Sequence, residues 1–294
     1  ELFPTRLLWW FVAEGTLEWA HLLRQELRPH LGGRGGAERV LSEIASAMLR
    51  RRYEVLRSGA LPALPDPDVS PRSVGLVMGA LLRAASHPER AWFFAAAGGA
   101  PGTLAEHALA EALIEPLSVR ARWQEVACHL GELLIALTER LPADLPRARP
   151  EHVLAAAPPA RPAAVLGQVC FAAGVRFARK MRKAFALGAG PAEALEVLRM
   201  SEYVFRVNPD HWQRSDAAAR TGFLEGTACP WFERPGWSGA HCGIFGQFQS
   251  GIASVFGLRY HLTETIPRHG GHTCRIDVRP LDAAPARPVK LRRK

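Results

Sequence analysis

The sequence predicts an α+β protein, in which an all-helical N-terminal domain precedes a domain with a helix packed on an antiparallel sheet. Apolar residues recur at helical spacing through most of residues 1–141, whereas segments rich in β-formers occur only after residue 202. Six prolines within residues 142–162 are typical of a linker. We therefore expect a helical domain at 1–141, a linker at 142–162, the α+β domain at 163–281 and a basic tail at 282–294.

Composition and charge narrow the class of protein. With 294 residues, of which 48% are apolar, the chain can bury a sizeable core. The formal charge of +9 is scattered over predicted helices without interleaved aromatic residues, so we expect a solvated surface and not a nucleic-acid site. Five cysteines do not suit a secreted disulfide framework, and charged residues interrupt the apolar N-terminus. We expect a cytoplasmic protein without a membrane segment, and we leave a homodimer open.

Periodicity and helix breakers define the predicted N-terminal helices. Apolar residues spaced by three and four predict helices over 5–28, 37–58, 71–86, 92–97, 104–114 and 117–141. Pro29 and the glycines up to 36 end the first helix, and prolines between 62 and 71 separate the second from the third. Glycines between 98 and 102, and then Pro116, divide the last three helices.

Two further helices and a strand are predicted directly after the linker. Residues 163–187 carry an apolar stripe that includes Cys170, which we interpret as a packing residue. The far end of this helix is basic, and we interpret it as a solvated face, with an anion or partner-protein patch as the alternative; the residues are Arg176, Arg179, Lys180, Arg182 and Lys183. Pro191 opens the next helix. The β-formers of 203–207 predict a strand.

The C-terminal segments predict a helix packed on a hairpin. Residues 242–256 return to helical periodicity, and Gly246 and Gly251 would allow another element to approach this helix closely. Residues 258–265 alternate as in a strand, 267–271 form a turn, and 273–278 alternate again. This order is typical of an antiparallel hairpin covered by a helix.

The stretch between residues 229 and 274 concentrates potential metal ligands. The hairpin would bring Glu264 close to Cys274, and Cys242 begins the helix beside them, where a helix N-terminus favours the thiolate. Two thiolates, a carboxylate and the imidazole of His269 or His272 suit a tetrahedral zinc ion. Cys229 is a reserve ligand. The alternative is that the cysteines are buried small residues and that the histidines are polar residues of the turn without a role as ligands.

The pattern C-x3-G-x4-G-x4-FG-x6-E-x6-G-x2-C resembles the four-vinyl reductase domain over about residues 163–280. It is formed by Cys242, Gly246, Gly251, Phe256, Gly257, Glu264, Gly271 and Cys274. The resemblance implies a small-molecule-binding domain whose zinc ligands include Cys242, Glu264 and Cys274. The family's fourth ligand falls on Pro267, which cannot bind a metal, so His269 or His272 would replace it. A looser similarity to the L-2-amino-thiazoline-4-carboxylic acid hydrolase family rests on Cys229-Pro230 and on the ending Gly270-Gly271-His272-Thr273-Cys274.

Two functions follow from these patterns. The first is the binding of a small, largely apolar organic molecule in a pocket braced by zinc; the candidate pocket residues are Phe205, Trp212, Phe223, Trp231, Trp237, Phe245 and Phe248. The second is a metal- or thiolate-dependent hydrolase acting on a thiazoline, amide or amidine; the candidate nucleophiles and bases are Cys229, Glu264, His241 and His211. A regulator that senses a ligand through a partner protein is a weaker third possibility.

Overall fold

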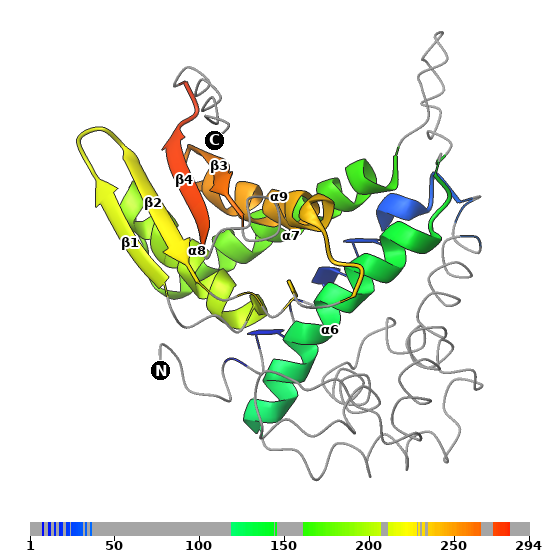
Figure 1. Ribbon diagram of the computed structural model, residues 1–294. Helices are drawn as coiled ribbons and strands as arrows, with labels where there is room; N and C mark the ends of the chain where they lie inside the picture. The colour runs from blue at the N-terminus through cyan, green and yellow to red at the C-terminus, as the bar shows by residue number, and fades with distance from the viewer. Residues whose placement is uncertain are drawn as a thin grey trace, which may run out of the picture.

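The computed structural model describes scattered positions between 8 and 36, and residues 119–143, 145, 161–206, 211–227, 229, 231–232, 235–265 and 273–282. Figure 1 shows how the elements of this part of the chain are arranged. In order they are α6 (Val119–Arg140), α7 (Pro162–Ala184), α8 (Pro191–Arg206), β1 (His211–Asp216), β2 (Thr221–Gly226), α9 (Gly239–Val255), β3 (Leu258–Glu264) and β4 (Cys274–Pro280).

The four strands form one antiparallel sheet in the order β1-β2-β4-β3. Trp212 of β1 lies opposite Glu225 of β2, and Glu225 lies opposite Arg275 of β4. Arg275 in turn pairs with Glu264 of β3, just after an irregularity in the ladder between Leu262 and Glu264. The C-terminal region is therefore α+β, as the sequence predicted.

The helices cover one face of this sheet in successive layers. Helix α8 packs on β1 and β2, and α9 packs on β3. Helix α7 lies along α9, and α6 contacts α8 (Figure 1). Strand residues on the covered face, such as Leu224, Ile276 and Val278, are buried in the same hydrophobic core as residues of α6, α7, α8 and α9. The alternation of the strands directs every second side chain to the opposite face of the sheet.

Two glycines allow the backbones of α7 and α9 to touch. A Cβ atom on Gly174 of α7 would lie 1.9 Å from the carbonyl oxygen of Phe248. A Cβ atom on Gly251 of α9 would lie 2.2 Å from the carbonyl oxygen of Phe171. These atoms belong to backbone and cannot move aside as a flexible side chain would. The predicted close approach at Gly251 is thus confirmed, and the approaching element is α7.

Most predicted elements of the C-terminal half agree with the structure to within a few residues. Helices were predicted at 117–141, 163–187 and 242–256, and strands at 258–265 and 273–278; α6, α7, α9, β3 and β4 occupy these positions. The described positions between 8 and 27 are helical, in accord with the helix predicted over 5–28. The helices predicted at 37–58, 71–86, 92–97 and 104–114, most of the linker, and the tail beyond 282 lie outside the described residues.

The strand predicted at 203–207 is wrong, because residues 203–206 form the last turn of α8. Tyr203, Val204 and Phe205 are all buried, and the indole N–H of Trp123 donates to the carbonyl oxygen of Val204 (2.8 Å). Tertiary burial outweighs the local β preference of these side chains. The sequence also failed to reveal the hairpin of β1 and β2, whose first strand, HWQRSD, is too polar to indicate a buried sheet.

The helix crossing makes a direct prediction about stability. Replacing Gly251 by Ala forces α7 and α9 apart, and we expect it to lower the free energy of unfolding by about 1–3 kcal/mol. Gly243 is the matched control, since it lies in the same helix and a Cβ atom there would meet nothing within 4 Å. Gly243→Ala should raise the stability by about 0.5–1 kcal/mol. Urea unfolding followed by circular dichroism measures both, and equal effects at the two positions would contradict the crossing.

Candidate functional site

The structure brings several predicted site residues to one end of the C-terminal region. Strand β3 ends at Glu264 and β4 begins at Cys274, which lies opposite Gly226 at the end of β2. The hydroxyl of Thr273 donates to a carboxylate oxygen of Glu264 (3.5 Å). Because α9 leads through a short turn into β3, which runs back along it, Cys242 in the first turns of α9 faces this same end. The predicted convergence of Cys242, Glu264 and Cys274 stays a prediction, because nothing in the described geometry beyond this shared end brings the three side chains together.

The metal ligands predicted here do not form a complete set among the described residues. No three His, Cys, Asp or Glu side chains in the described ranges lie close enough together to hold a metal ion. Cys242, Glu264 and Cys274 therefore do not lie close enough together in this structure to hold a metal ion, and His269 and His272 lie outside the described residues. The indole N–H of Trp237 lies 3.4 Å from the Cys242 sulfur and donates to it, so this thiol already has one polar neighbour.

Cys170 has the packing role that the sequence predicted. It lies on α7 and is only 2% exposed. Burial raises the pKa of its thiol to about 12, and a hydrogen bond with Trp19 opposes this shift to a smaller extent. A buried thiol whose pKa is raised in this way is not activated as a nucleophile.

His241 links the start of α9 to α6 through hydrogen bonds. Its Nδ1 accepts the backbone N–H of Ser238 (3.0 Å), so the neutral ring carries its proton on Nε2. Nε2 lies 2.8 Å from the hydroxyl of Thr138, which itself donates to the carbonyl oxygen of Ile135 (2.8 Å). Both ring nitrogens are therefore occupied. Burial lowers the pKa of His241, and the nearby Glu139 carboxylate offsets part of this shift.

Five of the seven predicted pocket aromatics form one continuous cluster along α9, which we call the aromatic cluster. Trp237 packs on Trp231, Trp231 meets the edge of Phe245, Phe245 stacks on Phe248, and Phe248 contacts Phe205. Ring centroids within the cluster are 4.8 to 5.5 Å apart. Four members are buried, and Trp237 is half-buried at the outer end, where it stacks on His241. The cluster thus runs from the core to the surface.

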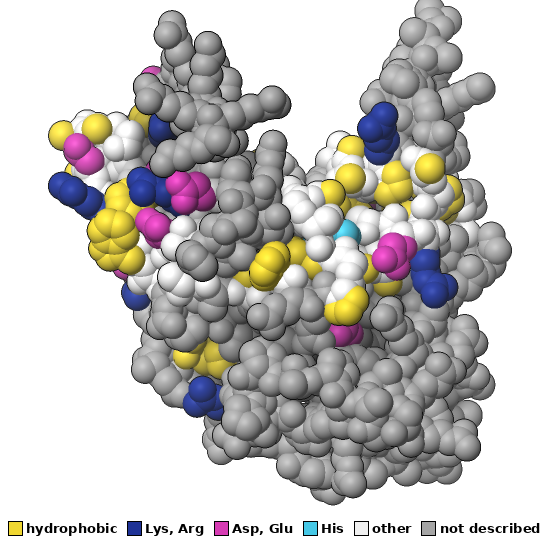
Figure 2. Space-filling model, in the orientation of Figure 1, with side chains coloured by type: hydrophobic (Ala, Val, Ile, Leu, Met, Phe, Trp, Pro, Cys, Tyr) yellow, Lys and Arg dark blue, Asp and Glu magenta, His cyan; other side chains and the backbone are white. Residues whose placement is uncertain are grey.

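The other two predicted pocket aromatics lie on the opposite face of the sheet. Trp212 of β1 is 61% exposed and meets the ring of Phe223 on β2. The guanidinium of Arg275 lies 4.0 Å from the centroid of Phe223 and pairs with Glu225 (3.6 Å). Figure 2 shows hydrophobic, basic and acidic side chains side by side over the strands at the left of the view. Trp212 and Phe223 are therefore separated from the aromatic cluster by the sheet.

A buried polar network joins the sheet to the helices, and sequence reasoning missed most of it. The hydroxyl of Tyr260 donates to Gln249 (2.6 Å), whose amide donates to Glu202. Nε2 of His211 lies 3.8 Å from the other oxygen of Glu202. Within the described part of the chain, Nδ1 of His211 has no hydrogen-bond partner. Only His211 was predicted as a site residue, because an isolated Glu, Gln or Tyr in an amphipathic segment gives no local signal of burial.

The predicted catalytic residues do not share one site in the described structure. His211 is only 2% exposed at its side chain and faces Glu202 beneath the sheet, whereas Glu264 is exposed at the end of β3. Cys229 is half-buried in the loop after β2 and packs against the core. No three of these four side chains gather closely enough to hold a metal ion in the described part of the chain.

Compared with protein-family models, with curated proteins and with solved structures, the chain matches none of them. The resemblance to the four-vinyl reductase domain accordingly stays a prediction. None of the described helices combines the length and the apolar content that a bilayer-spanning helix requires.

The two bonds of His241 predict a dependence of stability on pH. Because folding lowers the pKa of His241, its stabilising contribution is complete above its ordinary pKa of about 6.5 and is lost as the pH falls through the lowered value. His241→Ala should cost about 1 kcal/mol at neutral pH, a fall in melting temperature of about 2–4 °C, and should flatten the slope of melting temperature against pH below about 6.5. Exposed His261→Ala is the control. An unchanged slope in His241→Ala would refute the role of this side chain.

Proposed function

We propose that the C-terminal region binds a small, largely apolar organic molecule against the aromatic cluster. The observation that carries this proposal is the continuity of the cluster from buried Phe205 to half-buried Trp237. Sites for small organic ligands are mostly apolar and aromatic and have a few polar groups that orient the ligand. Here the polar groups at the outer end are the thiol of Cys242 and the indole N–H of Trp237.

We propose that a structural zinc ion stabilises this site, and we call it the zinc brace. Glu264 and Cys274 flank the segment of the sequence that contains His269 and His272, and Cys242 lies in the first turns of α9, whose C-terminal end leads into β3. A zinc ion held by four protein side chains would have no open position for water, and such closed sites are structural. Zinc would then join the start of α9 to the base of the hairpin without taking part in a reaction.

The alternative function, hydrolysis, has less support from the geometry. A hydrolase needs a base beside its nucleophile or a metal-bound water. Both ring nitrogens of His241 are engaged in holding α9, and His211 is buried against Glu202. These contacts leave neither candidate histidine available beside Cys229 or Glu264, so we favour binding over catalysis.

Truncation of the exposed end of the aromatic cluster tests the binding proposal. We expect the neutral apolar dye Nile red to bind the full chain, and Trp237→Ala to weaken binding about tenfold, since one lost aromatic contact is worth roughly 1–1.5 kcal/mol. Trp212→Ala is the matched control, because it removes a more exposed indole on the other face of the sheet. Fluorescence titration measures both. Equal affinities in Trp237→Ala and the wild type would place the ligand elsewhere.

Metal analysis tests the zinc brace separately. We expect about one zinc ion per purified chain, as in structural zinc sites, and its loss in Cys242→Ser and in Cys274→Ser. Cys170→Ala should retain it, because this thiol is buried on α7. Chelation should lower the melting temperature of the wild type and leave that of Cys274→Ser unchanged. Zinc retained in both serine variants, or absent from the wild type, would remove the brace from the proposal.

A further inference from the structure

A cavity lies at the C-terminal end of α9, away from the outer end of the aromatic cluster. It occupies about 860 Å³ where the last turn of α9 meets the C-terminal half of α7 and the residues that follow it. Its apolar wall consists of Phe171, Val175, Leu187 and Val255, and Phe171 is 37% exposed. We call this cavity the α7–α9 groove. From Cys242 to Ser254, which also lines the groove, α9 rises about 18 Å, so the groove is separate from the aromatic cluster's outer end.

The other wall of the α7–α9 groove is basic. Arg179, Arg182 and Lys183, all from α7, line it together with the hydroxyl-bearing Ser254. No Asp or Glu is among the described residues that line the groove. Three positive charges beside an apolar wall create a field that favours an anionic ligand with an apolar body.

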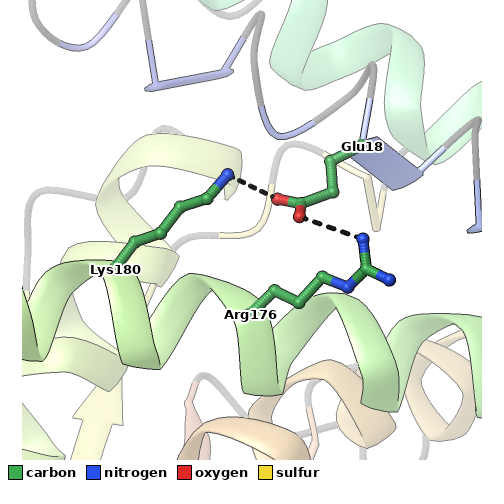
Figure 3. Close-up of polar contacts among 3 residues, drawn as sticks. All are labelled: Glu18, Arg176 and Lys180. Atoms are coloured by element: carbon green, nitrogen blue, oxygen red, sulfur yellow. Dashed lines mark hydrogen bonds and ion pairs between the residues drawn. The ribbon is translucent and has the colours of Figure 1, made fainter.

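Contacts with Glu18 divide the cations of α7 into two sets. Lys180 pairs with Glu18 at 2.8 Å and Arg176 pairs with it at 3.4 Å, and Figure 3 shows both side chains rising from α7 to the one carboxylate. Neither residue lines the groove. Among the described residues, no carboxylate pairs with Arg179 or Lys183. The charges that face the groove are thus the ones that Glu18 leaves unneutralised.

Arg182 has a different, fixed position at the base of the groove. Its guanidinium donates to the carbonyl oxygens of Gly188 (3.1 Å), Leu187 (3.4 Å) and Val255 (3.5 Å). It also lies 5.7 Å from the ring centroid of Phe256. Arg182 therefore offsets the partial negative charge at the carboxyl ends of α7 and α9, which would otherwise repel an anion. Its own charge is shared with carbonyl groups and is not cancelled by a carboxylate.

We propose that the α7–α9 groove binds a small organic anion that joins a carboxylate or phosphate group to an apolar body. The anionic group lies between Arg179 and Lys183, and the apolar body lies on Phe171, Val175 and Val255. The volume of the groove falls within the range of about 300–1,000 Å³ that small-molecule sites occupy. This site is independent of the proposed aromatic site, and either one can be correct without the other.

Paired charge removals on one helix test the proposal. The probe is decanoate, which displaces the fluorescent anion 1-anilinonaphthalene-8-sulfonate from the full chain, and 1-decanol is its uncharged counterpart. We expect Arg179→Gln with Lys183→Gln to weaken decanoate binding at least about tenfold, because charge-assisted hydrogen bonds are lost. The control, Arg176→Gln with Lys180→Gln, removes the same charge from the same helix outside the groove and should change the affinity less than about threefold, through long-range field alone.

Further variants and ligands distinguish binding in the groove from attraction to a basic surface in general. Phe171→Ala should weaken decanoate binding with all charges kept, whereas Trp237→Ala should leave it unchanged. Decanol should bind more weakly than decanoate, and 0.5 M salt should reduce the difference. Three results would overturn the proposal. They are equal losses in the two double variants, decanol binding that is as tight as that of decanoate and equally weakened by Phe171→Ala, and flotation with phosphatidylglycerol vesicles that depends on Arg179 and Lys183 in place of monomer binding. Circular dichroism and the melting temperature establish that each variant is folded.

Discussion

The backbone contact between α7 and α9 is the constraint on which the rest of the C-terminal region depends. At Gly174 and Gly251 there is no room for a side chain between the two helices. Since α9 also packs on β3, and α8 packs on β1 and β2, the position of α9 relative to α7 fixes the distance from α7 to the whole sheet. Both candidate sites use this arrangement: the aromatic cluster follows α9, and the α7–α9 groove opens where the two helices end.

Polar contacts give the apolar core a defined geometry. The indole of Trp123 donates to Val204 on α8, and that of Trp231 donates to Ala127 on α6. Each tryptophan thus satisfies its one donor while its ring is buried, which aromatic packing alone would not require. Together with the bonds of His241, these contacts join α6 to both α8 and α9. The aromatic cluster is therefore held between elements that lie far apart in the sequence.

The distribution of charge separates a stabilising surface from a candidate binding surface on the same helix. The excess of basic residues in the whole chain suggests only a solvated, positive exterior. Glu18 pairs with one side of α7, where the exposed ion pairs contribute little to stability. The neighbouring cations face an apolar hollow that lacks a described carboxylate. One helix can thus present two basic faces with different roles, depending on which partner packs beside it.

The sequence by itself determined the helices α7 and α9 and the hairpin of β3 and β4, because hydrophobic period, glycine and proline are local signals. From these the sequence also predicted that Cys242, Glu264 and Cys274 converge, but no three potential metal ligands gather among the described residues. Only the tertiary structure decided that Tyr203 to Phe205 belong to a helix, that Trp212 and Phe223 lie on the far side of the sheet, and that Gln249 joins Glu202 to Tyr260. The physical reason is that the burial of a side chain depends on the element that packs against it. The neighbouring residues in the sequence do not show which element that is.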